Sequence, residues 1–283
     1  MKLPLRRRTI YIGAAAAALT LGLVGVGTAQ ASTSHVTSPA HAQPKPTVVL
    51  VHGAWADGSS WSGEVSRLQH DGYPVVVAPN PLRGLSSDAD YLRAFLSGIT
   101  GPIVLVGHSY GGAVITNAAT GNANVKALVY VDAYIPDANQ SVAGLTSADS
   151  VLAPAGSNPA SVFKLVTYPG APDGIYDTYL LPNVFAAALG GGLSSSQVSV
   201  LAASQSPTSL IALGEQSGAP AWASIPSWDL VGTQDKVIPP AAQLSMAEHA
   251  GAHVVKVNAA HLSLVTAPDA VTQLIETAAR ATA

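Results

Sequence analysis

The sequence predicts an α/β fold in which a mostly parallel sheet of about six strands is flanked by helices and interrupted by one long insertion. From residue 47 onward, short runs of Val, Leu and Ile alternate with helical stretches, which is typical of right-handed βαβ units. The runs are continuously apolar, as expected for strands buried on both faces. Residues 133–226 break this alternation, and an insertion of that length is typical of a cap rather than of a free loop.

Each predicted element follows from its local pattern. Six apolar, β-branched runs predict strands at residues 47–51, 74–78, 103–106, 125–131, 228–231 and 254–257. Apolar residues at helical spacing predict helices at residues 61–69, 88–99, 113–119 and 270–281. The core is therefore expected to comprise residues 47–132 and 227–283. Residues 133–226 are expected to form a helical cap. The best helix candidates in the cap are residues 177–189 and 195–205.

The first 31 residues have the three-part pattern of an export signal. Lys2 and three arginines at positions 6–8 precede an uncharged apolar stretch at residues 10–26, and Ala29-Gln30-Ala31 offers a cleavage site. The pair Arg7-Arg8 also resembles a twin-arginine signal, the alternative being a general secretory signal with three arginines. A retained membrane anchor is a further alternative, although about 17 apolar residues is marginal for a bilayer. We therefore expect a secreted protein, with a flexible linker at residues 32–46.

Composition excludes several classes of function. Apolar residues make up 48% of the 283 residues and charged residues 10%, which indicates a globular body. Without its first 31 residues the chain has 9 basic and 16 acidic residues, a formal net charge of −7. Nucleic acid and anionic membrane surfaces are therefore not expected partners, and no stable membrane anchor is expected after cleavage. The absence of cysteine excludes disulfides, thiolate metal sites and a cysteine nucleophile.

The segment Gly107-His108-Ser109-Tyr110-Gly111 matches the pattern G-x-S-x-G and lies between a predicted strand and a predicted helix. In that context the chain turns sharply enough to push the serine hydroxyl out of the sheet, and only small neighbours permit the turn. Ser109 is therefore the predicted nucleophile. A Gly-rich structural turn is the alternative interpretation.

A serine nucleophile needs a base, because its hydroxyl is hardly ionised near neutral pH. Among the histidines of the folded part, His261 follows the last predicted strand at its carboxyl end, where catalytic groups gather in open parallel sheets. The other candidates are His52, His70, His108, His249 and His253. His108 lies inside the turn, and its side chain is expected to point away from Ser109.

The base in turn needs a carboxylate to fix its tautomer. Asp235 and Asp132 each follow a predicted strand directly, and each satisfies the chain order nucleophile, acid, base. We favour Asp235 and keep Asp132 as the alternative acid, with helix capping or attachment of the cap as the alternative role of Asp132.

The loop His52-Gly53-Ala54-Trp55 follows the first predicted core strand. A loop at this position can donate a backbone N–H group to a developing oxyanion, and the residue after the nucleophile donates the second. Ala54 and Tyr110 are the predicted donors, with Gly53 allowing close approach of the backbone.

Together, these segments resemble the α/β-hydrolase superfamily, and in particular its branch of small esterases and hydroxynitrile lyases, over residues 47–281. The resemblance implies a Ser109–His261–Asp235 triad, an oxyanion hole at Ala54 and Tyr110, a helical cap and no cofactor. Two departures favour hydrolysis. The lyases carry Thr at the position of Gly53, and a Lys that handles cyanide at the position of Leu262.

The leading hypothesis is thus a carboxylic-ester hydrolase acting on a small, apolar ester, with no cofactor and no metal. A cofactor-free perhydrolase or haloperoxidase-type activity, or a carbon–carbon lyase, could use the same triad, and a non-enzymatic binding protein on this scaffold is a third class. Aromatic residues of the cap could line an apolar pocket or form the core of the cap: Trp222, Tyr176, Tyr179 and Phe185.

Overall fold

Six parallel strands form the main sheet of the protein, whose computed structural model describes residues 44–282. The strand order is β2-β1-β3-β4-β8-β9, and every pair is parallel. The strands are β1 (Thr47–Val51), β2 (Val75–Val77), β3 (Ile103–His108), β4 (Val125–Val131), β8 (Ser227–Gly232) and β9 (His253–Val257). The predicted fold class, with six strands near the predicted positions, is confirmed.

The strands β3, β4 and β8 are buried on both faces, as their apolar runs predict, but β9 is not. Val254 is 38% exposed and Val255 43% exposed, because β9 lies at one edge of the sheet and pairs only with β8. The apolar run at residues 254–257 therefore predicted the strand β9 correctly but did not predict how exposed its side chains are.

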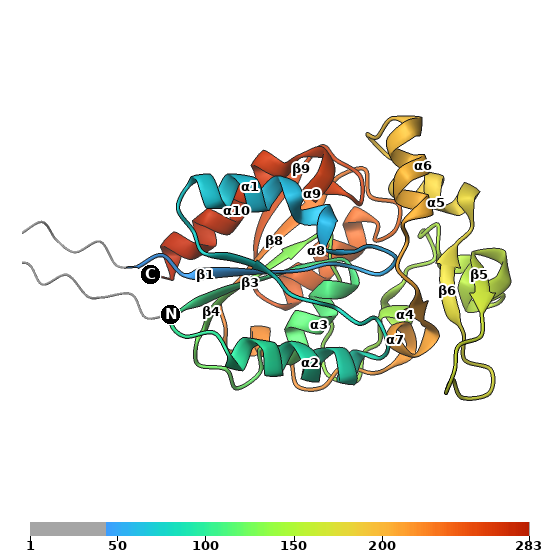
Figure 1. Cartoon of the computed structure of the whole chain (residues 1–283), viewed down its shortest axis with the longest axis horizontal. Helices are drawn as coiled ribbons and strands as arrows, with labels where there is room; N and C mark the ends of the chain where they lie inside the picture. The colour runs from blue at the N-terminus through green and yellow to red at the C-terminus, as the bar shows by residue number, and fades with distance from the viewer. Residues whose placement is uncertain (1–43, 283) are drawn as a thin grey trace, which may run out of the picture. The chain divides into compact units, whose positions relative to one another are not determined.

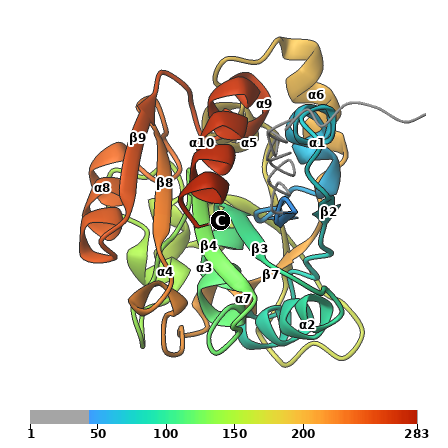
Figure 2. The same cartoon turned by 90° about the vertical axis from the view of Figure 1, so that its left-hand side faces the viewer.

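Helices cover both faces of the sheet (Figures 1 and 2). Helices α1 (Ser62–His70) and α10 (Pro268–Ala281) pack together on one face, and α2 (Leu85–Ser97) and α3 (Tyr110–Ala118) pack together on the other. Helix α8 (Pro240–His249) packs against β8 and β9, and the short α9 (Ser263–Thr266) precedes α10. Within residues 44–282, no helix is long and apolar enough to cross a membrane.

The insertion at residues 133–226 contains helices and also an antiparallel sheet of order β5-β6-β7, which the sequence did not predict. The strands are β5 (Phe163–Val166), β6 (Asp177–Leu180) and β7 (Thr208–Ser209), and the helices are α4 (Val142–Leu145), α5 (Pro182–Leu189), α6 (Ser195–Ala203) and α7 (Leu210–Gly214). Single turns of 3₁₀-helix also occur, one in the core and the others in the insertion: η1 (Gly58–Trp61), η2 (Ala153–Gly156), η3 (Pro159–Ser161) and η4 (Ala221–Ala223).

The predicted helix at residues 177–189 is wrong for its first four residues, which form β6. Leu181 precedes a proline, and proline disfavours the helical region for the residue before it. Pro182 instead takes the first helical position of α5. The predicted helix at residues 195–205 corresponds to α6, which starts with a capping box formed by Ser194 and Gln197.

The end of the predicted linker is attached to the core. The Lys45 ammonium donates a hydrogen bond to the Asp71 carbonyl and lies 4.1 Å from the centre of the Tyr73 ring. The predicted export signal and the rest of the predicted linker lie outside the described residues.

Candidate active site

Ser109 occupies a sharp turn between β3 and α3. Its backbone angles, φ 52° and ψ −124°, lie in a region that costs about 1–3 kcal/mol for a residue with a side chain. A Cβ atom on Gly107 would lie 2.6 Å from the Gly111 carbonyl oxygen, and one on Gly111 would lie 2.6 Å from the Val51 carbonyl oxygen. Both glycines are therefore required by close backbone approach, which is the reason the sequence pattern suggests.

A continuous chain of hydrogen bonds starts at the Ser109 hydroxyl. The Ser109 Oγ atom lies 2.9 Å from His261 Nε2, and His261 Nδ1 lies 2.8 Å from Asp235 Oδ2. Both the ring and the carboxylate are shielded from water, since His261 is 2% exposed and Asp235 is 4% exposed. With Asp235 ionised, Nδ1 donates to the carboxylate and Nε2 is left to accept the serine proton.

Neighbouring groups hold the Asp235 carboxylate in place. Its Oδ1 atom accepts hydrogen bonds from the backbone N–H groups of Val237 (2.7 Å) and Ile238 (3.0 Å). Its Oδ2 atom also accepts one from Gln243 Nε2 of α8 at 2.8 Å. Sequence reasoning missed Gln243, because nothing in the local pattern of α8 distinguishes it from any other helical glutamine.

Asp132, the alternative acid, is fully buried, but its hydrogen bonds go to backbone groups and not to the His261 ring. Its Oδ1 atom accepts a hydrogen bond from the Gly232 N–H group at 2.8 Å, and its Oδ2 atom accepts one from the Ser263 N–H group at 3.0 Å. Burial raises the pKa of the Asp132 carboxyl well above its usual range, and the nearby charge of Asp235 raises it further. Asp132 thus links the loop that bears Asp235 to the loop that bears His261.

The loop after β1 packs directly on the serine turn. A Cβ atom on Gly53 would lie 2.7 Å from Ser109 Cβ and 2.9 Å from His108 Nδ1, so this close approach requires glycine. The His52 carbonyl oxygen accepts a hydrogen bond from Asn80 Nδ2 at 2.8 Å, and burial lowers the pKa of the His52 ring. His52 therefore supports the loop through its backbone.

The His108 side chain contacts the loop of the base rather than Ser109. Its Nε2 atom lies 2.9 Å from the His261 carbonyl oxygen. Burial lowers the pKa of His108 well below its usual value, and the neighbouring His261 lowers it further. A neutral His108 ring that donates from Nε2 therefore fits this contact.

The Tyr110 side chain is anchored to α2 through its hydroxyl. Its hydroxyl donates a hydrogen bond to Asp88 Oδ2 at 2.7 Å, and Asp88 Oδ1 accepts one from the Arg83 N–H group at 3.1 Å. The first turn of α3, which bears the Tyr110 amide, is thereby tied to the first turn of α2.

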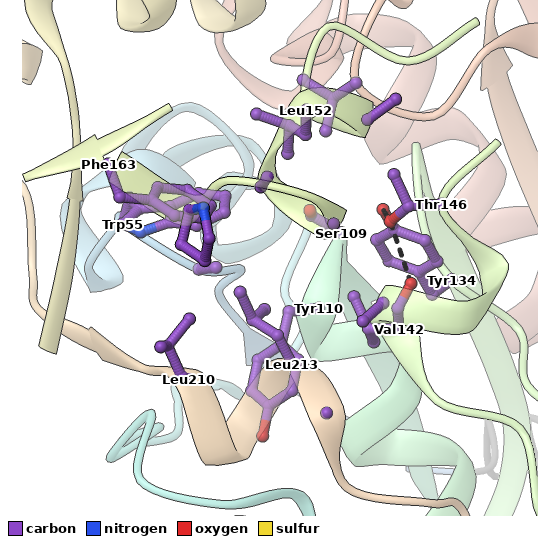
Figure 3. Close-up of a pocket in the computed structure, with 18 of the residues that line it drawn as sticks. Trp55, Ser109, Tyr110, Tyr134, Val142, Thr146, Leu152, Phe163, Leu210 and Leu213 are labelled. Atoms are coloured by element: carbon purple, nitrogen blue, oxygen red, sulfur yellow. Dashed lines mark hydrogen bonds between the residues drawn. The ribbon is translucent and has the colours of Figure 1, made fainter. Parts of the chain in front are cut away.

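A cavity of about 520 Å³ opens beside Ser109, between the main sheet and the cap (Figure 3). Ala54 and Tyr110, the two predicted amide donors, line it together with Ser109. The Tyr134 hydroxyl lies 3.1 Å from Thr146 Oγ1, which in turn donates to the Val142 carbonyl oxygen. None of the side chains that line the cavity is charged. Its size is typical of small-molecule sites.

The aromatic side chains of this cavity are not those that the sequence suggested. Trp55, Phe163, Tyr110 and Tyr134 line it, together with aliphatic residues such as Leu152 and Leu210. The four cap aromatics named above are absent from its lining, and Phe185 instead belongs to the buried core.

We expect chelators to leave the activity unchanged. Within residues 44–282, no group of three or more His, Cys, Asp or Glu side chains could hold a metal ion. Initial rates measured before and after dialysis against EDTA provide the test. Loss of activity that a single metal restores would contradict this expectation.

An α/β fold with a serine turn, a buried histidine and a carboxylate at the carboxyl ends of its strands defines a serine-hydrolase type of scaffold. Residues 48–274 match the model of the alpha/beta hydrolase family, and the chain therefore belongs to this family. Over 110 residues the chain is 34% identical to a carbendazim-hydrolysing esterase of Nocardioides sp. (strain SG-4G). That match covers 34% of this chain and 46% of the relative, so it spans about half of the relative's length.

Two solved structures illustrate the shared fold. A mutant polyneuridine aldehyde esterase is 20% identical, with a TM-score of 0.67 over 82% of this chain and 98% of its own. An extracellular alpha/beta-hydrolase from a Paenibacillus species is 21% identical, with a TM-score of 0.65 over 82% of this chain and 98% of its own. At these identities the likeness shows the fold alone.

Proposed function

We propose that the protein is a secreted hydrolase that cleaves small, neutral and apolar carboxylic esters through an acyl-enzyme on Ser109. The observation that carries this proposal is the hydrogen-bonded chain from Ser109 through His261 to Asp235, which opens into an apolar cavity. The name of the Nocardioides relative, a carbendazim-hydrolysing esterase, agrees with this class of reaction.

In the proposed reaction, Ser109 Oγ attacks the ester carbonyl carbon while His261 Nε2 takes the serine proton. The negative charge on the carbonyl oxygen is stabilised by the N–H groups of Ala54 and Tyr110. His261 then gives the proton to the leaving alcohol, and a water molecule attacks the acyl-enzyme by the same sequence. Asp235 stays ionised and holds the tautomer of His261 throughout.

The residues around the base favour hydrolysis over carbon–carbon cleavage. Leu262, which follows His261, is buried, and no lysine side chain lines the cavity. A neutral lining also favours uncharged substrates, because a carboxylate or an ammonium group would lose its hydration there without gaining a charged partner.

The proposed activity is tested with a series of p-nitrophenyl esters of increasing acyl length, assayed beside mandelonitrile cleavage and peroxide-dependent halogenation. We expect ester turnover and stoichiometric labelling of Ser109 by a fluorophosphonate, located by peptide mass spectrometry. Turnover confined to mandelonitrile or to the peroxide assay would assign the triad to the alternative chemistry. Absence of both labelling and turnover would point to a binding protein.

Secretion is tested separately by the mass of the mature protein. We expect the exported chain to begin at Ser32, because Ala29 and Ala31 place small residues at both key positions of the cleavage site. Intact mass spectrometry of protein recovered from the medium and from the membrane fraction provides the measurement. A mass that retains the first 31 residues would instead indicate an uncleaved anchor.

A further inference from the structure

Trp55, the residue after Ala54, is bound by two threonines of the cap. Its backbone N–H group donates to Thr208 Oγ1 at 3.0 Å, and its indole N–H group donates to Thr178 Oγ1, also at 3.0 Å. Both threonines are fully buried, and they face each other across the β6–β7 pair. The loop that bears a predicted oxyanion donor therefore ends on the cap sheet.

The two threonines form a connected pair, which we call the threonine clamp. Thr178 Oγ1 donates to the Thr208 carbonyl oxygen at 2.7 Å, so its lone pair points to the indole N–H group. The Trp55 ring also stacks on Phe163 of β5, with ring centroids 5.3 Å apart (Figure 3). All three strands of the cap sheet thus contact Trp55.

Trp55 needs such support because its backbone is in an unfavourable conformation. Its φ angle is 56°, in the left-handed region that a bulky residue rarely adopts. Strained residues persist only where their surroundings over-determine them. The hydrogen bond from the Trp55 N–H group to Thr208 is the contact that fixes the strained backbone directly.

The cap sheet is itself fixed to the core. The Ser209 N–H group donates to the Leu82 carbonyl oxygen at 2.9 Å. The Arg83 guanidinium contacts the Asp177 carboxylate at 2.7 Å and donates to the Pro207 carbonyl oxygen at 2.9 Å. The threonine clamp is therefore tied to the core by hydrogen bonds and an ion pair next to it in the chain.

We propose that Thr178 and Thr208 are positioning residues that set the oxyanion hole from the cap side. Ala54 is held between two fixed points: Gly53 packs on Ser109 before it, and the threonine clamp fixes Trp55 after it. This proposal rests on the proposed function, in which the Ala54 N–H group stabilises the oxyanion. Its consequence is that the cap controls turnover as well as substrate binding.

The test compares Thr208→Val with Thr208→Ser and Tyr168→Phe. Thr208 does not line the cavity, so its loss should act on kcat rather than on KM. The valine variant has nearly the same shape but no hydroxyl, whereas serine retains the acceptor. Tyr168→Phe also removes a cap hydroxyl, one that lies 3.3 Å from Ser209 Oγ and does not contact Trp55. Rates are expressed per active site, counted by complete fluorophosphonate labelling.

We expect Thr208→Val to lower kcat about tenfold or more, since loss of a whole oxyanion donor costs about 10²–10³, while KM changes less than about threefold. Thr208→Ser should keep the wild-type kcat, and Tyr168→Phe should match the wild type.

A wild-type kcat in Thr208→Val, or an equal fall of kcat in Tyr168→Phe, would overturn the proposal. If the valine variant yields no labelled sites, Thr178→Val, which removes the indole acceptor, is judged by the same criteria. A wild-type protein without labelling or turnover would instead refute the proposed function.

Discussion

Replacing Ser109 with alanine is expected to abolish ester hydrolysis, with turnover falling by about 10⁴–10⁶. The variant loses the predicted nucleophile, whose hydroxyl is the one hydrogen-bond partner of His261 Nε2 within residues 44–282, at 2.9 Å. Alanine keeps the Cβ atom that packs on Gly53, so the turn and the fold should persist. Turnover of purified Ser109→Ala on the preferred p-nitrophenyl ester, with folding checked by circular dichroism, measures the effect.

Ser217→Ala is the matched control for this prediction. Ser217 is as buried as Ser109, with 3% against 5% of its surface exposed, but its hydroxyl bonds to Asn117 and it does not line the cavity. We expect this variant to keep wild-type turnover. Retention of more than a few per cent of activity in Ser109→Ala would exclude the serine as nucleophile.

Replacing Asp235 with asparagine is expected to lower turnover about 10⁴-fold, far more than the same change at Asp132. The Asp235 carboxylate accepts hydrogen bonds from His261, Gln243 and two backbone N–H groups. An amide has one acceptor oxygen and places an NH₂ group against the remaining donors. The variant can therefore no longer hold the tautomer in which His261 Nε2 accepts the serine proton.

Asp132→Asn serves as the comparison, because it makes the same chemical change at an equally buried aspartate. Its two oxygens accept the N–H groups of Gly232 and Ser263, and asparagine satisfies only one of them. We expect a loss of about 1–3 kcal/mol in the free energy of unfolding and a fall in turnover per labelled site of about tenfold at most. Kinetics and urea denaturation of both variants decide the matter. A fully active Asp235→Asn together with an inactive Asp132→Asn would exchange their roles.

The sequence determined the parallel sheet and the order of the candidate residues along it. Continuous Val, Leu and Ile runs mark buried strands because a strand between two helical layers is apolar on both faces. Residues that follow such strands lie together at the carboxyl ends of the strands. For this reason the sequence indicated Ser109, Asp235 and His261 as candidate catalytic residues. The glycines at 53, 107 and 111 were also readable, because each reflects a local demand for close backbone approach.

The sequence favours Asp235 over Asp132, but only the tertiary structure shows which of them is hydrogen-bonded to His261. Asp132 comes directly after β4 and Asp235 comes three residues after β8, and both precede the base in the chain, so the sequence favours Asp235 without excluding Asp132. The difference lies in contacts across long sequence distances: Asp235 meets a ring 26 residues away, whereas Asp132 bonds to backbone groups 100 and 131 residues away. The geometry of the loops at the carboxyl ends of the strands decides such contacts, and residue type alone does not predict that geometry.

The cap was the least predictable part for the same reason. Its strands are short, and each is stabilised by hydrogen bonds to another segment of the cap rather than by its own local pattern. The spacing of the apolar residues therefore suggested a helix where β6 forms. The cavity aromatics Trp55 and Phe163 come from the core loop and the cap sheet, and they meet across 108 positions of the chain. Thr178, Thr208 and Gln243 look like ordinary polar residues in the sequence. Sequence periodicity reports what the backbone prefers locally, whereas the support of a site depends on which distant side chains the finished fold brings within hydrogen-bonding distance.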